Sequence, residues 1–426
     1  MSVKCIVSCP ISTYSGYGAR SRDLVKALIE VYPDWDIKIL PQRWGNTRKG
    51  FLEDVGDTFF LPRLIERIEY KPDVWIQITI PNEFQPVGKY NIGITAGIEA
   101  TLCHPTWIEG LNRMDLTLAS SNFTKETFVN TSFTKKDSRT NTIVEEVKLQ
   151  KPVEVLFEGL DTQVYRTIQP SEVRLDLTDI QEQFAFLCIG HWMQGNLGHD
   201  RKNIGYTVKA FLETFKNKAN QPALILKTSK STSSIIDRDD ILTKINIIRK
   251  SVKGRLPNVY LLHGDLEDGE INELYNHPKV KALLMISKGE GFGRPMLEFA
   301  ATGKPILATN WSGHTDFLRS DFTALVPGEL ENIHTSAAVK DILLPEAQWF
   351  KPDDQAVGTT MRKIVKEYKV FSKKAKEQQS YVLNNFTYEH MRDKLKDYFD
   401  QYVPDFPKEI KLELPKLNLP KLKKIS

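Results

Sequence analysis

Glu290 and Glu298 flank a glycine-containing turn in the segment 287–316. Pro295 just after the turn and Gly303 beyond it predict a short helix, because proline suits the first turn and glycine follows the last. The free backbone N–H groups at such a helix start suit an anion such as phosphate. Carboxylates on each side suit sugar hydroxyls, which donate well to charged acceptors. This segment therefore predicts a site for a ligand that carries both groups.

The spacing alone is equally that of two solvated surface glutamates, so the whole string matters. Glu290-Gly-Phe-Gly-Arg-Pro-Met-Leu-Glu298, followed by GKPILAT, resembles the E-x7-E signature of the retaining glycosyltransferases of family four, which have the two-domain GT-B fold. The resemblance implies that Glu290 and the backbone amides of Gly291, Phe292 and Gly293 face the donor sugar. It implies that Glu298 holds the ribose of the nucleotide.

A second group of charged residues comes between the expected strand 184–189 and the expected helix 205–217. Arg201 and Lys202 are adjacent there, and cations before a helix can neutralise a departing diphosphate. An Arg-Lys pair is common on surfaces, but family members carry a lysine at this position, which implies the role for Lys202. Many also carry an earlier arginine; that position holds none here, so Arg201 is assigned as its substitute. Lys227, near a later strand end, is a further donor-binding candidate.

The beginning of the chain predicts a strand at 3–8, a turn with Gly16 and Gly18, and a helix at 19–32. Strand, glycine turn and helix is the order by which α/β folds present backbone to phosphate. In the family resembled, such a loop lies under the diphosphate. The absence of a third glycine argues against a dinucleotide-binding dehydrogenase.

Candidates for contact with the acceptor come from two loops. The segment around Glu99, His104 and Trp107 resembles a subgroup of the same family, which places Glu99 near the acceptor and the other two close by. A histidine beside a proline is more often structural than catalytic. The loop with Arg43 and Trp44 mixes cations with an aromatic ring, so it suits an acceptor, a nucleic acid included, and equally a solvated surface.

Composition limits the function classes. The 426 residues are 41% hydrophobic, which supports real cores, and no apolar run approaches the length of a membrane span. The start lacks a signal-peptide pattern and the four cysteines are scattered, so we expect a reduced cytoplasmic setting and no metal site. Net charge is +4, of which the last 23 residues hold most. A near-neutral body argues against a strongly basic nucleic-acid surface.

Alternating strands and helices in both halves predict an α/β protein with the GT-B fold: two Rossmann-like, doubly wound parallel-sheet domains that face across a cleft. We expect the segment 131–151 to be a loop or insertion. The expected parts are an N-terminal acceptor domain at 1–165 joined by a helix at 386–403, a nucleotide-sugar-binding domain at 166–385, and an extended basic Pro-Lys-Leu tail at 404–426.

The resemblance implies retaining transfer of a sugar from a nucleoside-diphosphate sugar, with UDP or GDP, to a hydroxyl acceptor, without a metal or another cofactor. A glycan or lipid-linked sugar is the broad expectation for the acceptor, and the oligomeric state is open. Alternatives are a phage-type DNA glycosyltransferase acting on a hydroxymethylated base, an epimerase or phosphorylase on the same fold, and a non-catalytic sugar- or nucleic-acid-binding module. Intact Glu290, Glu298 and Lys202 argue against the last.

Overall fold

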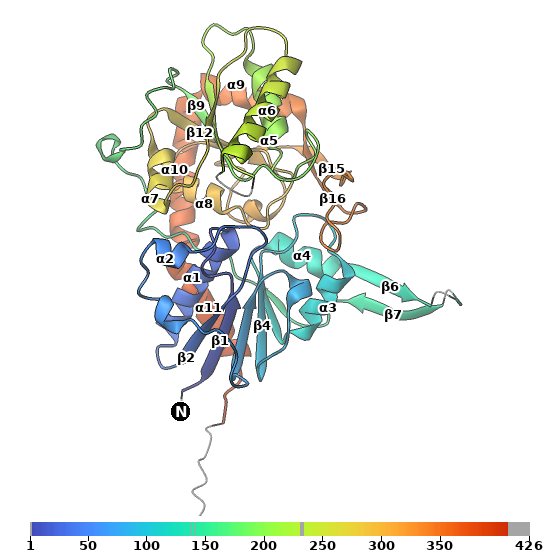
Figure 1. Cartoon of the computed structure of the whole chain (residues 1–426). Helices are drawn as coiled ribbons and strands as arrows, with labels where there is room; N and C mark the ends of the chain where they lie inside the picture. The colour runs from blue at the N-terminus through green and yellow to red at the C-terminus, as the bar shows by residue number, and fades with distance from the viewer. Residues whose placement is uncertain (1, 138, 141, 231–233, 408–426) are drawn as a thin grey trace, which may run out of the picture.

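The computed structural model describes residues 2–137, 139–140, 142–230 and 234–407. Two six-stranded parallel sheets build two domains, drawn one above the other in Figure 1. The sheet of the first domain has the strand order β2-β1-β3-β4-β5-β8. Its strands are β1 (Lys4–Cys9), β2 (Asp36–Pro41), β3 (Val74–Ile78), β4 (Tyr90–Thr95), β5 (Leu116–Ala119) and β8 (Val153–Val155).

The sheet of the second domain has the order β11-β10-β9-β12-β13-β14. Its strands are β9 (Ala185–Ile189), β10 (Ala223–Lys227), β11 (Val259–Leu262), β12 (Val280–Met285), β13 (Ile306–Thr309) and β14 (Ala324–Val326). Central strands such as β9 and β12 are apolar almost throughout, as expected of parallel strands that are covered on both faces. The predicted pair of doubly wound domains is confirmed.

Helices follow the strands in both domains. In the first they are α1 (Gly16–Val31), α2 (Phe51–Asp54), α3 (Pro105–Arg113) and α4 (Asn122–Asn130). In the second they are α5 (Ile204–Phe215), α6 (Ile235–Ser251), α7 (Asp268–Asn276), α8 (Arg294–Ala300), α9 (Asp354–Lys366) and α10 (Tyr368–Asn385). Helix α6 begins at Ile235 because the Ser234 side chain accepts a hydrogen bond from the Asp237 amide and caps its first turn.

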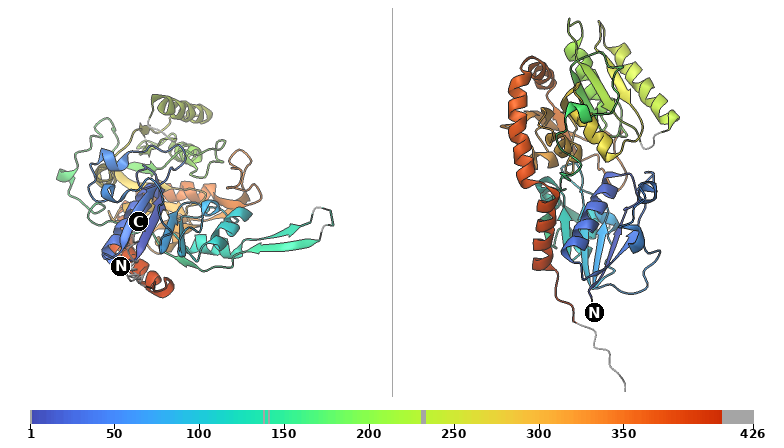
Figure 2. Two further views of the ribbon diagram at one scale, coloured as in Figure 1. Left: turned by 60° about the horizontal axis from the view of Figure 1, so that its bottom comes forward. Right: turned by 90° about the vertical axis from the view of Figure 1, so that its left-hand side faces the viewer.

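The last helix returns to the first domain. Helix α11 (Tyr388–Tyr402) directly follows α10, and the two run down one side of the molecule across both domains in the right-hand view of Figure 2. Phe399 of α11 lies against Tyr32 and Trp35, just beyond the end of α1, with ring centroids 5.8 and 6.3 Å apart. This return was expected from the fold class.

The segment 131–151, expected to be a loop or an insertion, is an insertion built from two regular strands. The strands β6 (Ser132–Lys136) and β7 (Ile143–Lys148) form an antiparallel hairpin that projects from the first domain (Figure 1). Its inner end packs against the core through Val147, while Ile143 and Val144 are mostly exposed. An alternation of apolar and polar residues reveals a strand when one of its faces is buried. The strands of this arm stand in solvent and carry many charged residues, so no such alternation marks them in the sequence. Most of the tail expected at 404–426 lies outside the described residues.

A second antiparallel pair was not expected. The strands β15 (Gly328–Asn332) and β16 (Gln348–Pro352) precede α9, and Trp349 of β16 is fully buried. The amide of Thr101 in the first domain donates to the Gln348 carbonyl at 2.9 Å. The pair therefore adds a contact between the domains.

Candidate active site

The turn between the two glutamates follows β12 and leads into α8. Gly293 has φ +102, a left-handed conformation that glycine adopts without strain, and a Cβ there would lie 2.8 Å from Met296. A Cβ on Gly313 would lie 2.1 Å from the Gly291 carbonyl oxygen. The Glu290 amide donates to the Ser312 hydroxyl at 2.9 Å, and the Gly313 amide donates to the Glu290 carbonyl at 2.9 Å. Close backbone packing therefore fixes the direction of the Glu290 side chain.

Glu290 is buried and ion-paired. Lys202 Nζ donates to Oε1 at 2.9 Å and to Oε2 at 2.7 Å, and Arg201 Nη1 lies 3.4 Å from Oε2. Burial alone would raise the pKa of Glu290, but the Lys202 and Arg201 charges lower that pKa to about 2. The carboxylate is therefore ionised at any physiological pH.

Arg201 joins the two domains at this point. Its Nη1 lies 3.1 Å from Oε1 of Glu99 in the first domain and donates to the Gly289 carbonyl at 2.9 Å. Burial opposes its charge, but Glu99 and Glu290 together raise the pKa of Arg201. The structure thus brings four predicted catalytic residues, Glu99, Arg201, Lys202 and Glu290, into one network of ion pairs.

Two serines of the first domain, which were not among the predicted site residues, also meet this turn. The hydroxyls of Ser120 and Ser121 donate to the Gly291 carbonyl at 3.1 and 2.6 Å. A Cβ on Gly291 would lie 2.5 Å from the Ala96 carbonyl oxygen. The glycines of the turn therefore allow the two domains to touch backbone to backbone.

Glu298 lies on α8 in a second buried network. Arg294 Nε donates to Oε1 at 2.9 Å, and the Tyr275 hydroxyl donates to Oε2 at 3.1 Å. Burial raises the pKa of Glu298 to about 7, and Arg294 opposes this rise. Phe292 is buried against Phe317, with ring centroids 4.9 Å apart, so its ring faces the core and only its backbone remains a candidate for the donor.

The glycine turn of the first domain forms the start of α1. Ser15 caps this helix, and its hydroxyl accepts from the Gly18 amide at 2.9 Å. A Cβ on Gly18 would lie 2.2 Å from the Thr13 carbonyl oxygen, whereas a Cβ on Gly16 would meet nothing within 4 Å. The predicted contact of Gly18 with the donor is revised, because its amide is already bonded and its role is close packing. Gly16 remains the candidate.

The other candidates spread around this region. Trp44 stacks on Tyr17 with ring centroids 3.9 Å apart, while Arg43 beside it is exposed. Lys227 Nζ donates to the Gly264 carbonyl at 2.5 Å, and burial lowers the pKa of Lys227. Arg43 and Trp44 remain candidates for contact with the acceptor, and Lys227 remains a candidate for contact with the donor.

Two acceptor candidates are structural. Trp107 is 1% exposed in the core of the first domain, so we withdraw it as an acceptor-binding residue. His104 caps α3: its Nδ1 accepts from the Thr106 amide at 3.3 Å, and its Nε2 lies 3.6 Å from Asp341. The P-x-W pattern thus serves helix α3, whose proline occupies the first turn and whose tryptophan faces inward.

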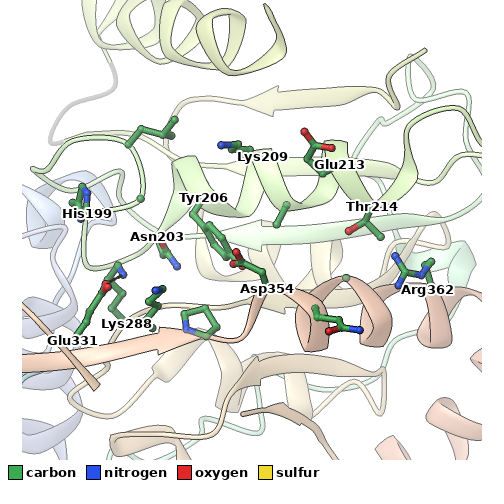
Figure 3. Close-up of a pocket in the computed structure, with 17 residues that line it drawn as sticks. His199, Asn203, Tyr206, Lys209, Glu213, Thr214, Lys288, Glu331, Asp354 and Arg362 are labelled. Carbon is green, nitrogen blue, oxygen red and sulfur yellow. Dashed lines mark hydrogen bonds and ion pairs between the residues drawn. The ribbon is translucent and has the colours of Figure 1, made fainter. Parts of the chain in front are cut away.

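A separate groove borders the loop that carries Arg201 and Lys202. It has a volume of about 660 Å³ and runs between α5 and α9, with His199 and Lys288 at one end and Arg362 at the other (Figure 3). Neither glutamate of the central motif lines it. The Lys288 amide donates to the Arg201 carbonyl at 2.8 Å, so the groove and the charged network share one wall.

Several solved structures resemble this chain along most of its length. Similar structures include a glycosyltransferase from Rickettsia africae ESF-5, HepE from Anabaena in complex with UDP and glucose, and a sucrose-phosphate synthase from Thermosynechococcus elongatus. Each is 12% identical to this chain; they cover 95%, 94% and 94% of it and 100%, 100% and 99% of their own length, with TM-scores of 0.63, 0.61 and 0.62. The fold is GT-B.

The sequence comparison covers a smaller part of this GT-B chain. Residues 247–348, about a quarter of the chain, match the family model described as "Glycosyl transferases group 1". The matched range contains both glutamates of the central motif and ends before α9. No curated protein sequence matches the chain. Within the described ranges, no helix has the length and apolar character needed to cross a bilayer.

Proposed function

We propose that this protein is a glycosyltransferase that moves a sugar from a nucleoside-diphosphate sugar to a hydroxyl acceptor with retention of anomeric configuration. The convergence of Lys202, Arg201 and Glu290 on one buried point between the domains carries this proposal. The family match over 247–348 and the GT-B fold support it. HepE, which shares the fold, was solved with UDP and glucose, so a UDP-sugar is the first donor to test.

The chemistry follows from the charges. The barrier to transfer lies in losing the diphosphate while the sugar becomes cation-like. Lys202 and Arg201 neutralise the negative charge that develops on the leaving diphosphate, and in a buried site they do so more strongly than in water. Glu290, ionised and released from its ion pairs by the arriving diphosphate, then faces the sugar. The acceptor hydroxyl attacks from the leaving-group face, and its proton passes to the departing phosphate.

The acceptor we propose is a glycan or a lipid-linked sugar. The DNA alternative depended on the cations of the segment 131–151, of the loop with Arg43 and of the lysine-rich tail, most of which lies outside the described residues. In the hairpin, Lys135 pairs with Glu109 at 2.7 Å and Lys148 pairs with Glu146 at 2.8 Å. Cations that are already paired attract a phosphate backbone less, so these two lysines give DNA binding little support.

A donor screen by thermal shift tests the proposed function. UDP-, GDP-, ADP- and dTDP-sugars are compared on wild type, on Glu298→Ala, and on Glu329→Ala, an exposed acid of β15 that serves as control. We expect one nucleotide to stabilise wild type and the control, by about 2.7 kcal/mol at 100 times its Kd, and not Glu298→Ala. No shift with any donor would contradict a nucleotide-sugar site.

Removal of residues 408–426 is expected to leave donor hydrolysis unchanged. Every candidate catalytic and donor-binding residue precedes residue 317, and the returning helix α11 ends at Tyr402. The measurement is the hydrolysis rate of the sugar nucleotide found in the screen, for the full chain and the shortened one. A rate that falls more than a few-fold would assign the tail a part in the donor reaction.

A further inference from the structure

Arg294 links two carboxylates that belong to opposite domains. Its Nη1 donates to Asp23 of α1 at 2.5 Å, and its Nε donates to Oε1 of Glu298 at 2.9 Å. The side chains are 18%, 20% and 9% exposed for Arg294, Asp23 and Glu298, so solvent screens these pairs only weakly. A planar guanidinium that bonds in two directions holds both partners in fixed orientations.

The position of Arg294 is costly without these partners. It is the first residue of α8, where the partial positive charge of the helix start disfavours a cation. Asp23, Glu298 and the buried Glu158 raise its pKa well above the ordinary value against the effect of burial. Acids of both domains surround Arg294 and so stabilise its charge at the start of the helix.

The two oxygens of Glu298 are each used once. Oε1 accepts from Arg294 and Oε2 accepts from Tyr275, which leaves acceptor capacity on both oxygens of an ionised carboxylate. This arrangement suits two neighbouring hydroxyl groups of one ligand. Protonation would convert one of those oxygens from acceptor to donor.

We infer that Arg294 is a positioning residue for donor binding, which orients the Glu298 carboxylate toward a vicinal diol and ties it through Asp23 to α1 of the first domain. The inference rests on the proposed function, in which that diol belongs to the ribose of the donor. Helix α1 begins at Gly16, the candidate for the diphosphate. The Arg294 side chain thus couples the two helices that would hold the ribose and the diphosphate of the donor.

The charged and titratable groups around Glu298 come from three helices and from the segment that follows β8. They are Arg294 on α8, Tyr275 and Asp268 on α7, Asp23, Arg20 and Arg22 on α1, and Glu158 and Tyr165 after β8. Burial raises the pKa of Glu298 to about 7, and Arg294 is the cation that opposes it most. As pH falls through this value, Glu298 gains a proton and binding of a diol should weaken. Loss of the Arg294 charge should move this midpoint to higher pH.

The test measures UDP and GDP affinity by calorimetry from pH 5.5 to pH 9 for wild type, Arg294→Lys, Arg294→Met and Asp23→Asn, with Arg238→Met on the exposed face of α6 as control. For Arg294→Met we expect affinity to fall about 10-fold to 100-fold near pH 7, with a midpoint at higher pH. For Arg294→Lys the midpoint should stay near the wild-type value. For Asp23→Asn we expect weaker binding at every pH, because the link to α1 is lost while the cation beside Glu298 remains.

The outcomes separate this inference from the proposed function. If wild type binds neither UDP nor GDP, the nucleotide site itself is contradicted. If wild type binds, and Arg294→Met keeps both the affinity and the midpoint, the positioning role is overturned. Should Arg294→Met fail to fold by circular dichroism, Asp23→Asn decides: unchanged affinity in that folded variant would equally overturn it.

Discussion

Replacement of Lys202 by methionine is expected to lower kcat by about 10²- to 10³-fold, the usual effect of removing one preorganised charge from a buried site. Lys202 Nζ donates to both oxygens of Glu290 and is 14% exposed. Without it, the leaving diphosphate would face Arg201 alone. The measurement is kcat for transfer, or for donor hydrolysis while the acceptor is unidentified, with the donor at saturation.

The matched control is Lys209→Met, a change at an exposed lysine of α5, the helix that follows Lys202, and it should retain the wild-type kcat. The variant Lys202→Arg distinguishes charge from geometry, because it keeps the cation and changes the shape of its hydrogen bonds. A Lys202→Met enzyme with a kcat within a few-fold of wild type would remove Lys202 from the catalytic residues. Thermal unfolding should be compared throughout, since the change also leaves Glu290 buried with one cation fewer.

Replacement of Trp107 by alanine is expected to cost about 3 to 5 kcal/mol in the free energy of unfolding, the usual cost of emptying a buried tryptophan site. Trp107 is 1% exposed and packs in the core cluster of the first domain with Ile108, Leu111 and Trp349. Urea denaturation gives the difference. Phe59→Ala, a change at a ring that is 39% exposed, is the control and should cost far less.

The variant Trp107→Phe decides between the structural role and the acceptor-binding role that the sequence predicted. It keeps most of the buried ring and should fold. If Trp107 only supports α3, its KM for the acceptor and its kcat will match the wild type. A raised KM for the acceptor in a fully folded Trp107→Phe protein would restore the original prediction.

Local rules made the central motif readable from sequence. Gly293 and Pro295 act within a few residues of themselves: one supplies a left-handed turn and the other suits a first helical turn. They predicted the turn and the helix, although α8 begins one residue earlier than Pro295, at Arg294. Alternating apolar strands and helices predicted two parallel sheets for the same reason, since each element carries its own pattern.

The hairpin at 132–148 escaped prediction because its strands stand in solvent. The periodicity that reveals a strand comes from burial of one face, and Ile143 and Val144 are exposed where a covered strand would hide them. The prediction that Trp107 contacts the acceptor failed for the opposite reason, because this side chain is buried. The sequence alone does not distinguish an aromatic residue that faces a ligand from one that faces the core.

The sequence by itself therefore determined the fold class, the turn and helix that carry Glu290 and Glu298, and the presence of Arg201 and Lys202 before a helix. Only the tertiary structure decided which charges meet. Arg294 and Asp23 are 271 positions apart, and Glu99 pairs with Arg201 across the domain interface. No local sequence pattern predicts such pairs. The segment around a residue determines where its side chain points, whereas the packing of the two domains determines which residue it meets.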